Sequence, residues 1–224
     1  MSSSVQPKRV RKTPEARRAE IVAAAAAVAL TEGLECITMR RMADELAVRP
    51  GLISHYFPVA EELVAEAFGS AATAELEELL PADPAAGRPV ERLARFFSLT
   101  AGERYDGMSR LWLNARHLSR FRDGLRERVG HQEARWRDRL TGVISAGVAA
   151  GEFRTEDPAF TAIHLLVVLD GLSAHANTDR GDPSERSAAV ANLAVSTAER
   201  ELRLPAGALR TRPENLRPAP PATD

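Results

Sequence analysis

Signals that begin an α-helix recur along this chain, whereas the alternation of apolar and polar residues that marks a β-strand is nowhere sustained. Thr13–Glu15 and Asp182–Glu185 each combine a capping residue, a following proline and an acidic residue, and Asp157–Pro158 repeats the first two elements. Proline suits the first helical position because the N–H that it lacks would have no partner there. The sequence therefore predicts an all-α fold.

The composition is that of a globular protein. Its 224 residues are 44% hydrophobic, which is enough for one small and one larger domain. No run of 18 apolar residues marks a membrane span and residues 1–12 lack the apolar stretch of a signal peptide, so we expect a cytoplasmic protein that does not contact a membrane. The single cysteine, Cys36, excludes an intrachain disulfide and a CxxC site. We expect neither a metal nor a cofactor.

The charge of the chain is unevenly distributed, although 30 basic and 31 acidic residues nearly cancel. Residues 1–60 hold nine Lys/Arg and six Asp/Glu, a balance of +3, which leaves 21 and 25 for residues 61–224, a balance of −4. A basic arm at the start attracts phosphate and releases counterions, although a solvated tail carries the same pattern. We expect residues 1–12 to be disordered. Their basic residues are Lys8, Arg9, Arg11 and Lys12.

Two short helices at an angle are predicted after the first helix. The first helix spans 13–33 and the second 39–46, and only residues 47–50 separate the second from a third helix of two turns. Pro50 takes the first position of the third helix, and Gly51 permits a close approach of the backbone. Two short helices joined by a tight turn and preceded by a basic arm indicate a helix-turn-helix, whose second helix enters the major groove of DNA.

The stretch from Thr13 to Phe68 resembles the TetR/AcrR family of transcriptional repressors. The resemblance lies in the capped helix start "TMR" at 38–40, in "VRPGLISHYF" at 48–57 and in "EELV" at 61–64, which opens the fourth helix. "GLISHYF" is similar to the corresponding segment of choline-responsive repressors of betaine synthesis. Two positions depart from the family pattern, which usually has Tyr at the place of Ser54 and often has Lys at the place of Ala60.

The resemblance implies which residues bind DNA. Arg40 would contact a base or a phosphate, Tyr56 would reach a phosphate, and the first turns of the third helix would approach base edges. The full set of expected DNA contacts is Lys8, Arg9, Arg11, Lys12, Thr38, Arg40, Arg49, Pro50, Gly51, Leu52, Ser54, His55 and Tyr56.

Beyond residue 70 the resemblance is one of architecture. A loop rich in Pro and Gly at 81–89 separates the fourth helix from the fifth. Further helices are predicted over 90–104, 109–118, 120–150, 158–178 and 184–203. After the arm over 1–12, the predicted parts are a helix-turn-helix DNA-binding domain over 13–58, a ligand-binding and dimerisation domain over 59–204, and a disordered proline-rich tail over 205–224.

A homodimer on a pseudo-palindromic operator is expected, because one two-turn helix cannot reach useful specificity and a two-fold dimer doubles the contacts. The helices at 158–178 and 184–203 would pair with those of the partner as a four-helix bundle. The candidates for this interface are Leu166, Val167, Leu169, Ala191 and Val195.

The larger domain holds most of the large aromatic residues, which predicts an apolar ligand site between its helices. Trp112 and Trp136 can each hold a cation at the ring face for ~0.5–2 kcal/mol. The betaine-pathway resemblance implies a quaternary ammonium ligand, but that resemblance lies in the DNA-binding part, so an apolar or aromatic metabolite stays open. Plain core packing is an equal interpretation for several of these residues. The candidate ligand contacts are Phe96, Phe97, Tyr105, Trp112, Trp136, Phe160 and His164.

No motif of catalysis is found: GxGxxG, GxxxxGK[ST], HExxH and GxSxG are absent from the sequence. Asp170 lies in an apolar stretch, where it is either a buried acid with a shifted pKa or the partner of an arginine. Two classes of function remain, a ligand-responsive DNA-binding repressor and an all-α enzyme or adaptor with a basic arm. The first is favoured, with no catalytic residues, double-stranded DNA and a small-molecule effector as partners.

Overall fold

The computed structural model describes residues 12–83, 87–100, 103–178 and 183–210, with only the backbone described at 103–104, 176, 178 and 183–191. Within these ranges the chain forms helices and turns and no strand, which confirms the predicted all-α fold. The helices are α1 (Pro14–Glu32), the one-turn 3₁₀ helix η1 (Leu34–Cys36), α2 (Met39–Glu45), α3 (Pro50–Tyr56), α4 (Ala60–Leu79), α5 (Pro89–Thr100), α6 (Glu103–Ser119), α7 (Asp123–Ala149), α8 (Pro158–Thr178) and α9 (Pro183–Glu201).

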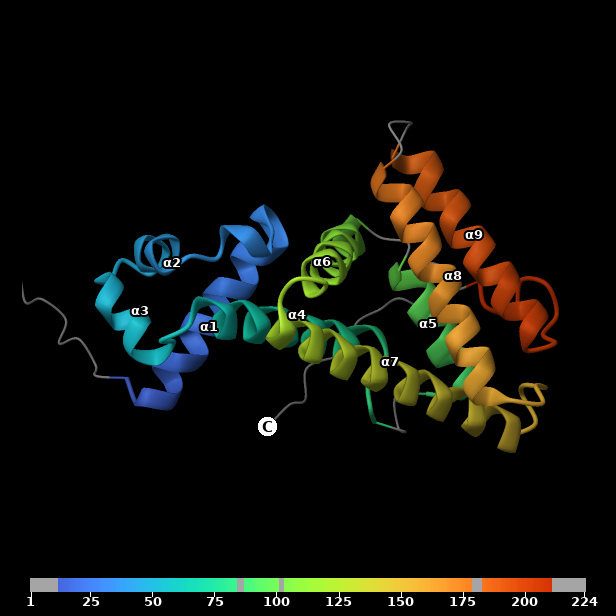
Figure 1. The fold of residues 1–224 in the computed structure, drawn as a ribbon. Coiled ribbons are helices and arrows are strands. Elements are labelled where there is room, and N and C mark those ends of the chain that lie inside the picture. Colours follow the sequence, from blue (N-terminus) through green and yellow to red (C-terminus); the bar gives the residue numbers. More distant parts are fainter. Residues whose placement is uncertain (1–11, 84–86, 101–102, 179–182, 211–224) are drawn as a thin grey trace, which may run out of the picture.

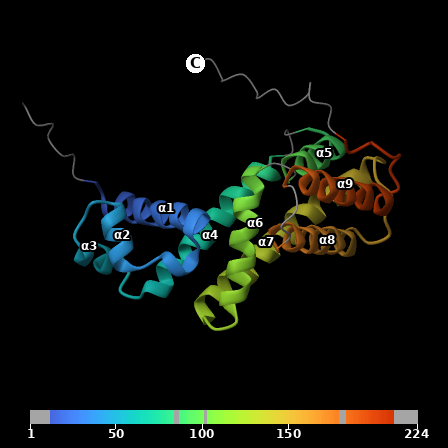
Figure 2. The ribbon, with the colours of Figure 1, turned by 90° about the horizontal axis from the view of Figure 1, so that it is seen from above.

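The helices form an N-terminal unit and a C-terminal unit joined by α4 (Figure 1). Helices α1, α2 and α3 lie at one end of the molecule, and α8 and α9 lie side by side at the other end. Helix α4 packs on α1 in the first unit and on α7 in the second. In both views α6 lies between the two units (Figures 1 and 2), where it contacts α1 and η1 on one side and α7 and α8 on the other.

The N-terminal unit is built as its sequence signals predict. The side chain of Thr13 caps α1 by accepting the Ala16 N–H at 3.2 Å, and α1 ends at Gly33, which has a φ of 99°. Between α2 and α3, Ala47 has a φ of 50°, and the chain turns there without a glycine. Phe57 is fully buried and completes the small core under the two short helices.

The break between the fifth and sixth helices lies earlier in the chain than the sequence predicts. The fifth helix was predicted to end at residue 104 and the sixth to begin at 109, whereas α5 ends at Thr100 and α6 begins at Glu103. The hydroxyl of Thr100 bonds to the Phe97 carbonyl at 3.0 Å, a local alternative to helical hydrogen bonding. The first turns of α6 pack Tyr105 and Met108 against the core, which no local signal in the sequence announces.

The proline-rich segment expected to be disordered from residue 205 packs against α9 as far as Arg210. The buried carboxylate of Glu199 accepts the backbone N–H groups of Gly207 at 3.0 Å and Leu209 at 2.9 Å, and Leu209 itself is buried. These two hydrogen bonds and one buried side chain offset the cost of ordering a short turn. Residues 211–224 of the predicted tail lie outside the described residues.

Helix α8 is apolar on most of its surface. Its segment Pro158–His175 is long and apolar enough, by length and composition, to cross a membrane, and it is 28% buried inside the structure. The same description fits a helix of a water-soluble protein that leaves an apolar face for a partner. Its exposed apolar residues are Phe160, Ile163 and Val167, which follow one another at helical spacings of three and four.

Gly147 in α7 leaves room for the ring of Phe153, which lies in the loop between α7 and α8. A Cβ atom at Gly147 would lie 2.0 Å from the ring of buried Phe153, so Gly147→Ala should destabilise the fold by about 1–3 kcal/mol. Gly142 is in the same helix with no neighbour within 4 Å of the added atom, and Gly142→Ala should stabilise by roughly 0.5–1 kcal/mol. Urea unfolding at one fixed protein concentration compares them, and equal effects would contradict the packing argument.

Candidate functional site

The helix-turn-helix presents α3 as an exposed surface over a buried base. The N–H of Val48 donates to the Ala43 carbonyl at 2.9 Å and closes the turn, while Ile53 faces the core. Thr38 caps α2 by accepting the Arg41 N–H at 3.1 Å, so its side chain has a structural task as well. Of the predicted DNA contacts, the half-buried ones are Leu52 and Tyr56, and Lys8, Arg9 and Arg11 lie outside the described residues. The exposed ones are Lys12, Thr38, Arg40, Arg49, Pro50, Gly51, Ser54 and His55.

The basic residues of this unit fall into two groups according to their partners. Arg41 pairs with Glu32 and Glu45, each at 2.6 Å. Arg18 donates from Nη1 and Nη2 to the two carboxylate oxygens of Glu66, and its guanidinium lies 4.7 Å from the centre of the Phe57 ring, so it holds the N-terminal unit to α4. Lys12, a predicted DNA contact, pairs with Glu20 at 2.8 Å on the surface.

Arg40 and Arg49 form the second group. Both are exposed, and neither has an ion pair within the described ranges. Positive charge that no internal carboxylate neutralises is available to a phosphate, whereas Arg41 would first have to leave two carboxylates. The sequence alone places Arg40 and Arg41 side by side and does not separate these roles.

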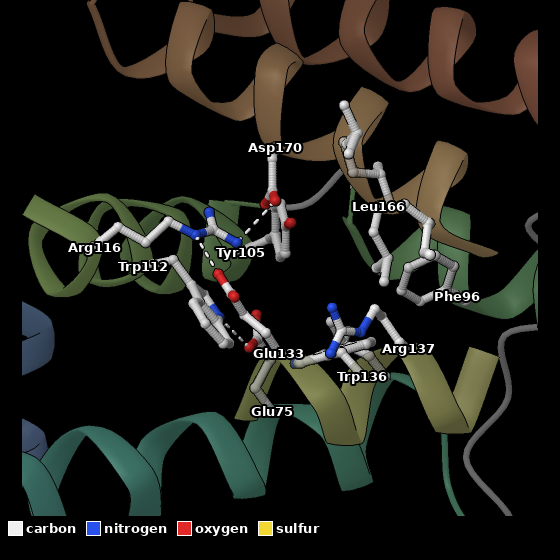
Figure 3. Close-up of a pocket in the computed structure, with 14 residues that line it drawn as sticks. Glu75, Phe96, Tyr105, Trp112, Arg116, Glu133, Trp136, Arg137, Leu166 and Asp170 are labelled. Atoms are coloured by element: carbon white, nitrogen blue, oxygen red, sulfur yellow. Dashed lines mark hydrogen bonds and ion pairs between the residues drawn. The ribbon is translucent and has the colours of Figure 1, made fainter. Parts of the chain in front are cut away.

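The C-terminal unit holds a cavity of about 200 Å³ between α4, α5, α6, α7 and α8 (Figure 3), which reaches the surface beside exposed Ile163 and Val167 of α8. It is smaller than the roughly 300–1,000 Å³ of a site for a drug-sized ligand, so it suits a small metabolite. Four of the seven predicted ligand contacts line it, namely Phe96, Tyr105, Trp112 and Trp136. The other lining residues are Glu75, Leu79, Arg116, Glu133, Arg137, Ile163, Leu166, Val167, Leu169 and Asp170.

Arg116 joins three helices at one wall of the cavity. Its Nη2 donates to Asp170 Oδ2 of α8 at 2.8 Å and its Nε to Glu133 Oε1 of α7 at 3.0 Å, and its guanidinium lies 5.0 Å from the centre of the Trp112 ring (Figure 3). Burial raises the pKa of Asp170, and the charge of Arg116 partly offsets that rise. The expected arginine partner of Asp170 and the shifted pKa are therefore both present.

Glu75 of α4 is a buried acid beside Trp112 (Figure 3). Its side chain is 6% exposed, and its Oε2 accepts the indole N–H of Trp112 at 2.7 Å. Burial raises the pKa of Glu75 to about 7, although the hydrogen bond from Trp112 acts in the other direction. Its sequence neighbours on α4 gave no sign of this role, because a Glu in a helix rich in Ala and Glu is ordinarily a surface residue.

Three predicted ligand contacts do not line the cavity, and one of them, Phe97, is buried in the core. Phe160 is 64% exposed on α8, and the Nδ1 of His164 lies 3.4 Å from Glu201 of α9. Both residues occupy the face of α8 that points away from the core, which follows from the helical phase that buries Leu165 and Leu169. The apolar character of α8 on all sides hid this phase from the sequence.

The opposite face of α6 holds the N-terminal unit. The side chain of Asn114 accepts the backbone N–H of Leu34 at 2.9 Å and donates to the two carboxylate oxygens of Glu35 at 2.8 and 2.9 Å. Trp112 and Arg116 stand two positions before and after Asn114, a spacing that places them on the other side of the helix. One helix therefore contacts both the cavity and the helix-turn-helix unit.

Comparison with known proteins identifies this arrangement. The family of BetI-type transcriptional repressor C-terminal domains matches residues 89–199, from the start of α5 into α9. The chain is a TetR-family regulator with a BetI-type C-terminal domain. The resemblance predicted from the helix-turn-helix is thus confirmed from the other end of the chain. TetR proteins are transcription regulators, so the enzyme alternative is excluded.

Solved structures share the TetR fold at low sequence identity. A putative TetR-family regulator from Rhodococcus sp. has a TM-score of 0.66 and 20% identity over 79% of this chain and 95% of its own. A putative regulator from Saccharomonospora viridis in complex with choline has a TM-score of 0.65 and 21% identity over 78% of this chain and 93% of its own. FadR from Bacillus subtilis in complex with stearoyl-CoA has a TM-score of 0.60 and 21% identity over 80% of this chain and 98% of its own. No curated protein matches the chain.

Proposed function

We propose that this TetR-family regulator is a cytoplasmic repressor that binds a pseudo-palindromic operator as a homodimer and leaves it when a small molecule fills the cavity. The observation that carries the proposal is the position of α6. Its Trp112 and Arg116 line the cavity, and its Asn114 bonds the segment just before α2. A ligand that fits better when α6 shifts would move the helix-turn-helix, because only differential affinity for two arrangements changes their populations.

The exposed surface of α3 supports DNA binding. Arg40 and Arg49 are exposed and have no ion pair with the described residues, and His55 is exposed as well, so that its imidazole can bond a base edge in the major groove. Tyr56 is half-buried, with its ring edge-on to His55 at 5.2 Å. In this arrangement the arginines and Tyr56 would fix the position on phosphates, and His55 would contribute to the choice of sequence.

The exposed apolar face of α8 supports the homodimer. Phe160 and Val167 are 64% and 61% exposed, and Leu193 of α9 is 52% exposed. Of the interface residues predicted from the sequence, Val167 stays a candidate, whereas Leu169 and Val195 are buried inside the chain. Two copies that bury this face against each other would place their helix-turn-helix units at the outer ends of the pair (Figure 1).

A quaternary ammonium compound of the size of choline is the proposed effector. The BetI-type domain, the choline of the Saccharomonospora viridis neighbour and the aromatic and acidic lining of the cavity all support this class. The cavity of about 200 Å³ is too small for a molecule such as the stearoyl-CoA of the FadR neighbour. A wider groove of about 950 Å³ between α1, α4, α5 and α6 adjoins the cavity at Glu75 and Tyr105 and would suit a larger apolar compound.

Adjacent arginines test the DNA-binding surface. Arg40→Ala should weaken binding to duplex DNA and reduce the slope of log affinity against log salt by roughly 1, because one phosphate contact is lost. Arg41→Ala removes the same charge from a residue already held by Glu32 and Glu45, and should leave the slope nearly unchanged. Fluorescence anisotropy across a salt series measures both, and the opposite order of effects would refute the assignment.

A charge placed on α8 tests the dimer. Val167→Glu should yield a monomer at micromolar concentration, because two carboxylates would be buried against each other in the interface. Val59→Glu is the matched control, since Val59 is 49% exposed at the start of α4 in the other unit. The mass from light scattering decides, and a monomeric wild-type protein would end the dimer proposal.

Titration of the protein–operator complex with choline tests the effector. The operator is selected from a pool of randomised duplexes. Choline should change the fluorescence of Trp112 and Trp136, the two tryptophans of the chain, and release the DNA in the same concentration range. If choline changes neither signal while a hydrophobic compound changes both, the quaternary ammonium class is wrong and effector control itself remains supported.

A further inference from the structure

Among the described residues the carboxylate of Glu75 has no ion-pair partner, although the nearby charge of Arg116 acts to lower its pKa. Its carboxylate lines the cavity and accepts one hydrogen bond, from the neutral indole of Trp112. Within the described ranges no Lys or Arg forms an ion pair with it. Glu75 is only 6% exposed, and a buried carboxylate is costly to ionise without a neighbouring cation. In the described part of the chain, therefore, no positive group is bonded to Glu75.

The arginines of the cavity do not supply that group. Arg116 already serves two carboxylates, Glu133 at 3.0 Å and Asp170 at 2.8 Å. Arg137 also lines the cavity, but it is exposed. With Glu75, three carboxylates thus face two guanidinium groups, and the deepest carboxylate is the unpaired one. An anionic ligand would increase this excess of negative charge, whereas a monovalent cation would remove it.

The rings that line the cavity suit a cation as well. The guanidinium of Arg116 lies over one face of Trp112, and the ring of Phe68 is perpendicular to that of Trp112, with 5.0 Å between the ring centres. The other rings that line the cavity are those of Tyr105, Trp136 and Phe96, and the ring centres of Trp136 and Phe96 lie 6.0 Å apart. An aromatic face holds an ammonium group most strongly where water is excluded.

We propose that Glu75 is the residue by which this cavity selects its ligand's charge: its carboxylate is the counter-ion of an ammonium group that packs against Trp136 and Tyr105. The inference rests on the proposed effector role of the cavity and goes further, because it assigns discrimination between cations and neutral molecules of the same shape to one side chain. Trp112 then positions Glu75 through its N–H and does not itself hold the cation.

Proton linkage follows from the position of Glu75. Because burial raises its pKa to about 7, Glu75 carries a proton on much of the free protein at neutral pH, and a bound cation would displace that proton. Cation affinity should therefore be highest above pH 7 and about ten-fold lower at pH 6 than at pH 8.

Other ionisable groups near Glu75 do not produce the same dependence. Burial raises the pKa of Tyr105 well above its ordinary range, so it stays neutral, and Asp170 is paired with Arg116. The groups that face Glu75 or share its cavity or groove are Tyr105, Arg110 and Arg116 on α6, Glu133 and Arg137 on α7, Asp170 on α8, and Glu78 on α4; the lining residues of α1 and α5 are uncharged.

Glu75→Gln tests the inference, because glutamine keeps the acceptor for Trp112 and removes only the charge. Tryptophan fluorescence of the free protein is titrated from pH 6 to pH 8 with choline, with tetramethylammonium and with 3,3-dimethyl-1-butanol, the neutral carbon analogue of choline. In Glu75→Gln, the affinity for both cations should fall about ten-fold at pH 8 and lose its pH dependence. The neutral analogue should bind both proteins alike at every pH.

Glu61→Gln is the matched control, since Glu61 is exposed in the first turn of α4, does not line the cavity or the adjoining groove, and is not among the groups that shift the pKa of Glu75. It should keep the wild-type pH profile. If Glu75→Gln keeps the cation affinity and its pH dependence, or if no cation binds the wild-type protein, the inference is overturned. If cations bind in the Glu75-dependent way but do not release operator DNA, the inference stands and the proposed effector role fails.

Discussion

The buried hydrogen bond from Trp112 to Glu75 joins α6 to α4, and the arrangement of the whole protein depends on where these two helices lie. Helix α4 belongs to both units, since it packs on α1 at one end and on α7 at the other. A buried carboxylate requires a donor, and the indole N–H at 2.7 Å is that donor. The bond thus fixes α6 against α4 at the cavity, next to the contact of α6 with the N-terminal unit.

Helix α6 has polar attachments on two faces, and each attachment reaches a different part of the chain. Arg116 connects it to α7 and α8, and Asn114 connects it to η1, directly before the helix-turn-helix. Buried or half-buried polar groups are costly to separate from their partners, so such attachments have few alternative arrangements. Under the proposed function, a ligand that changes the cavity wall would act on the DNA-binding unit through this helix.

The positive charge of the N-terminal unit is divided between folding and recognition. Arg18 binds Glu66 and stacks on Phe57, and Arg41 bridges Glu32 and Glu45. These pairs orient α1 and α2 against their neighbours, while Arg40 and Arg49 remain exposed. The net charge of residues 1–60, which is +3, therefore does not tell which of their basic residues are available to a phosphate and which are held in ion pairs.

The sequence by itself determined the class of fold, the helix-turn-helix and the family. Local signals decide these features: Thr13 and Thr38 cap α1 and α2, Pro50 begins α3, and the spacing between them fixes the turn. It also named four aromatic residues of the cavity, because large rings between helices are rarely solvent-exposed.

Only the tertiary structure decided the role of the charged residues and the phase of α8. Glu75 is indistinguishable in sequence from the surface glutamates of α4, and its burial comes from α6, whose contact with it lies 37 positions along the chain. The apolar pattern of α8 has no preferred side, so packing against α7 and α9 placed Leu169 inside and Phe160 outside. The physical reason is common to both cases: burial and pairing are properties of contacts between distant segments, and local propensity carries no information about them.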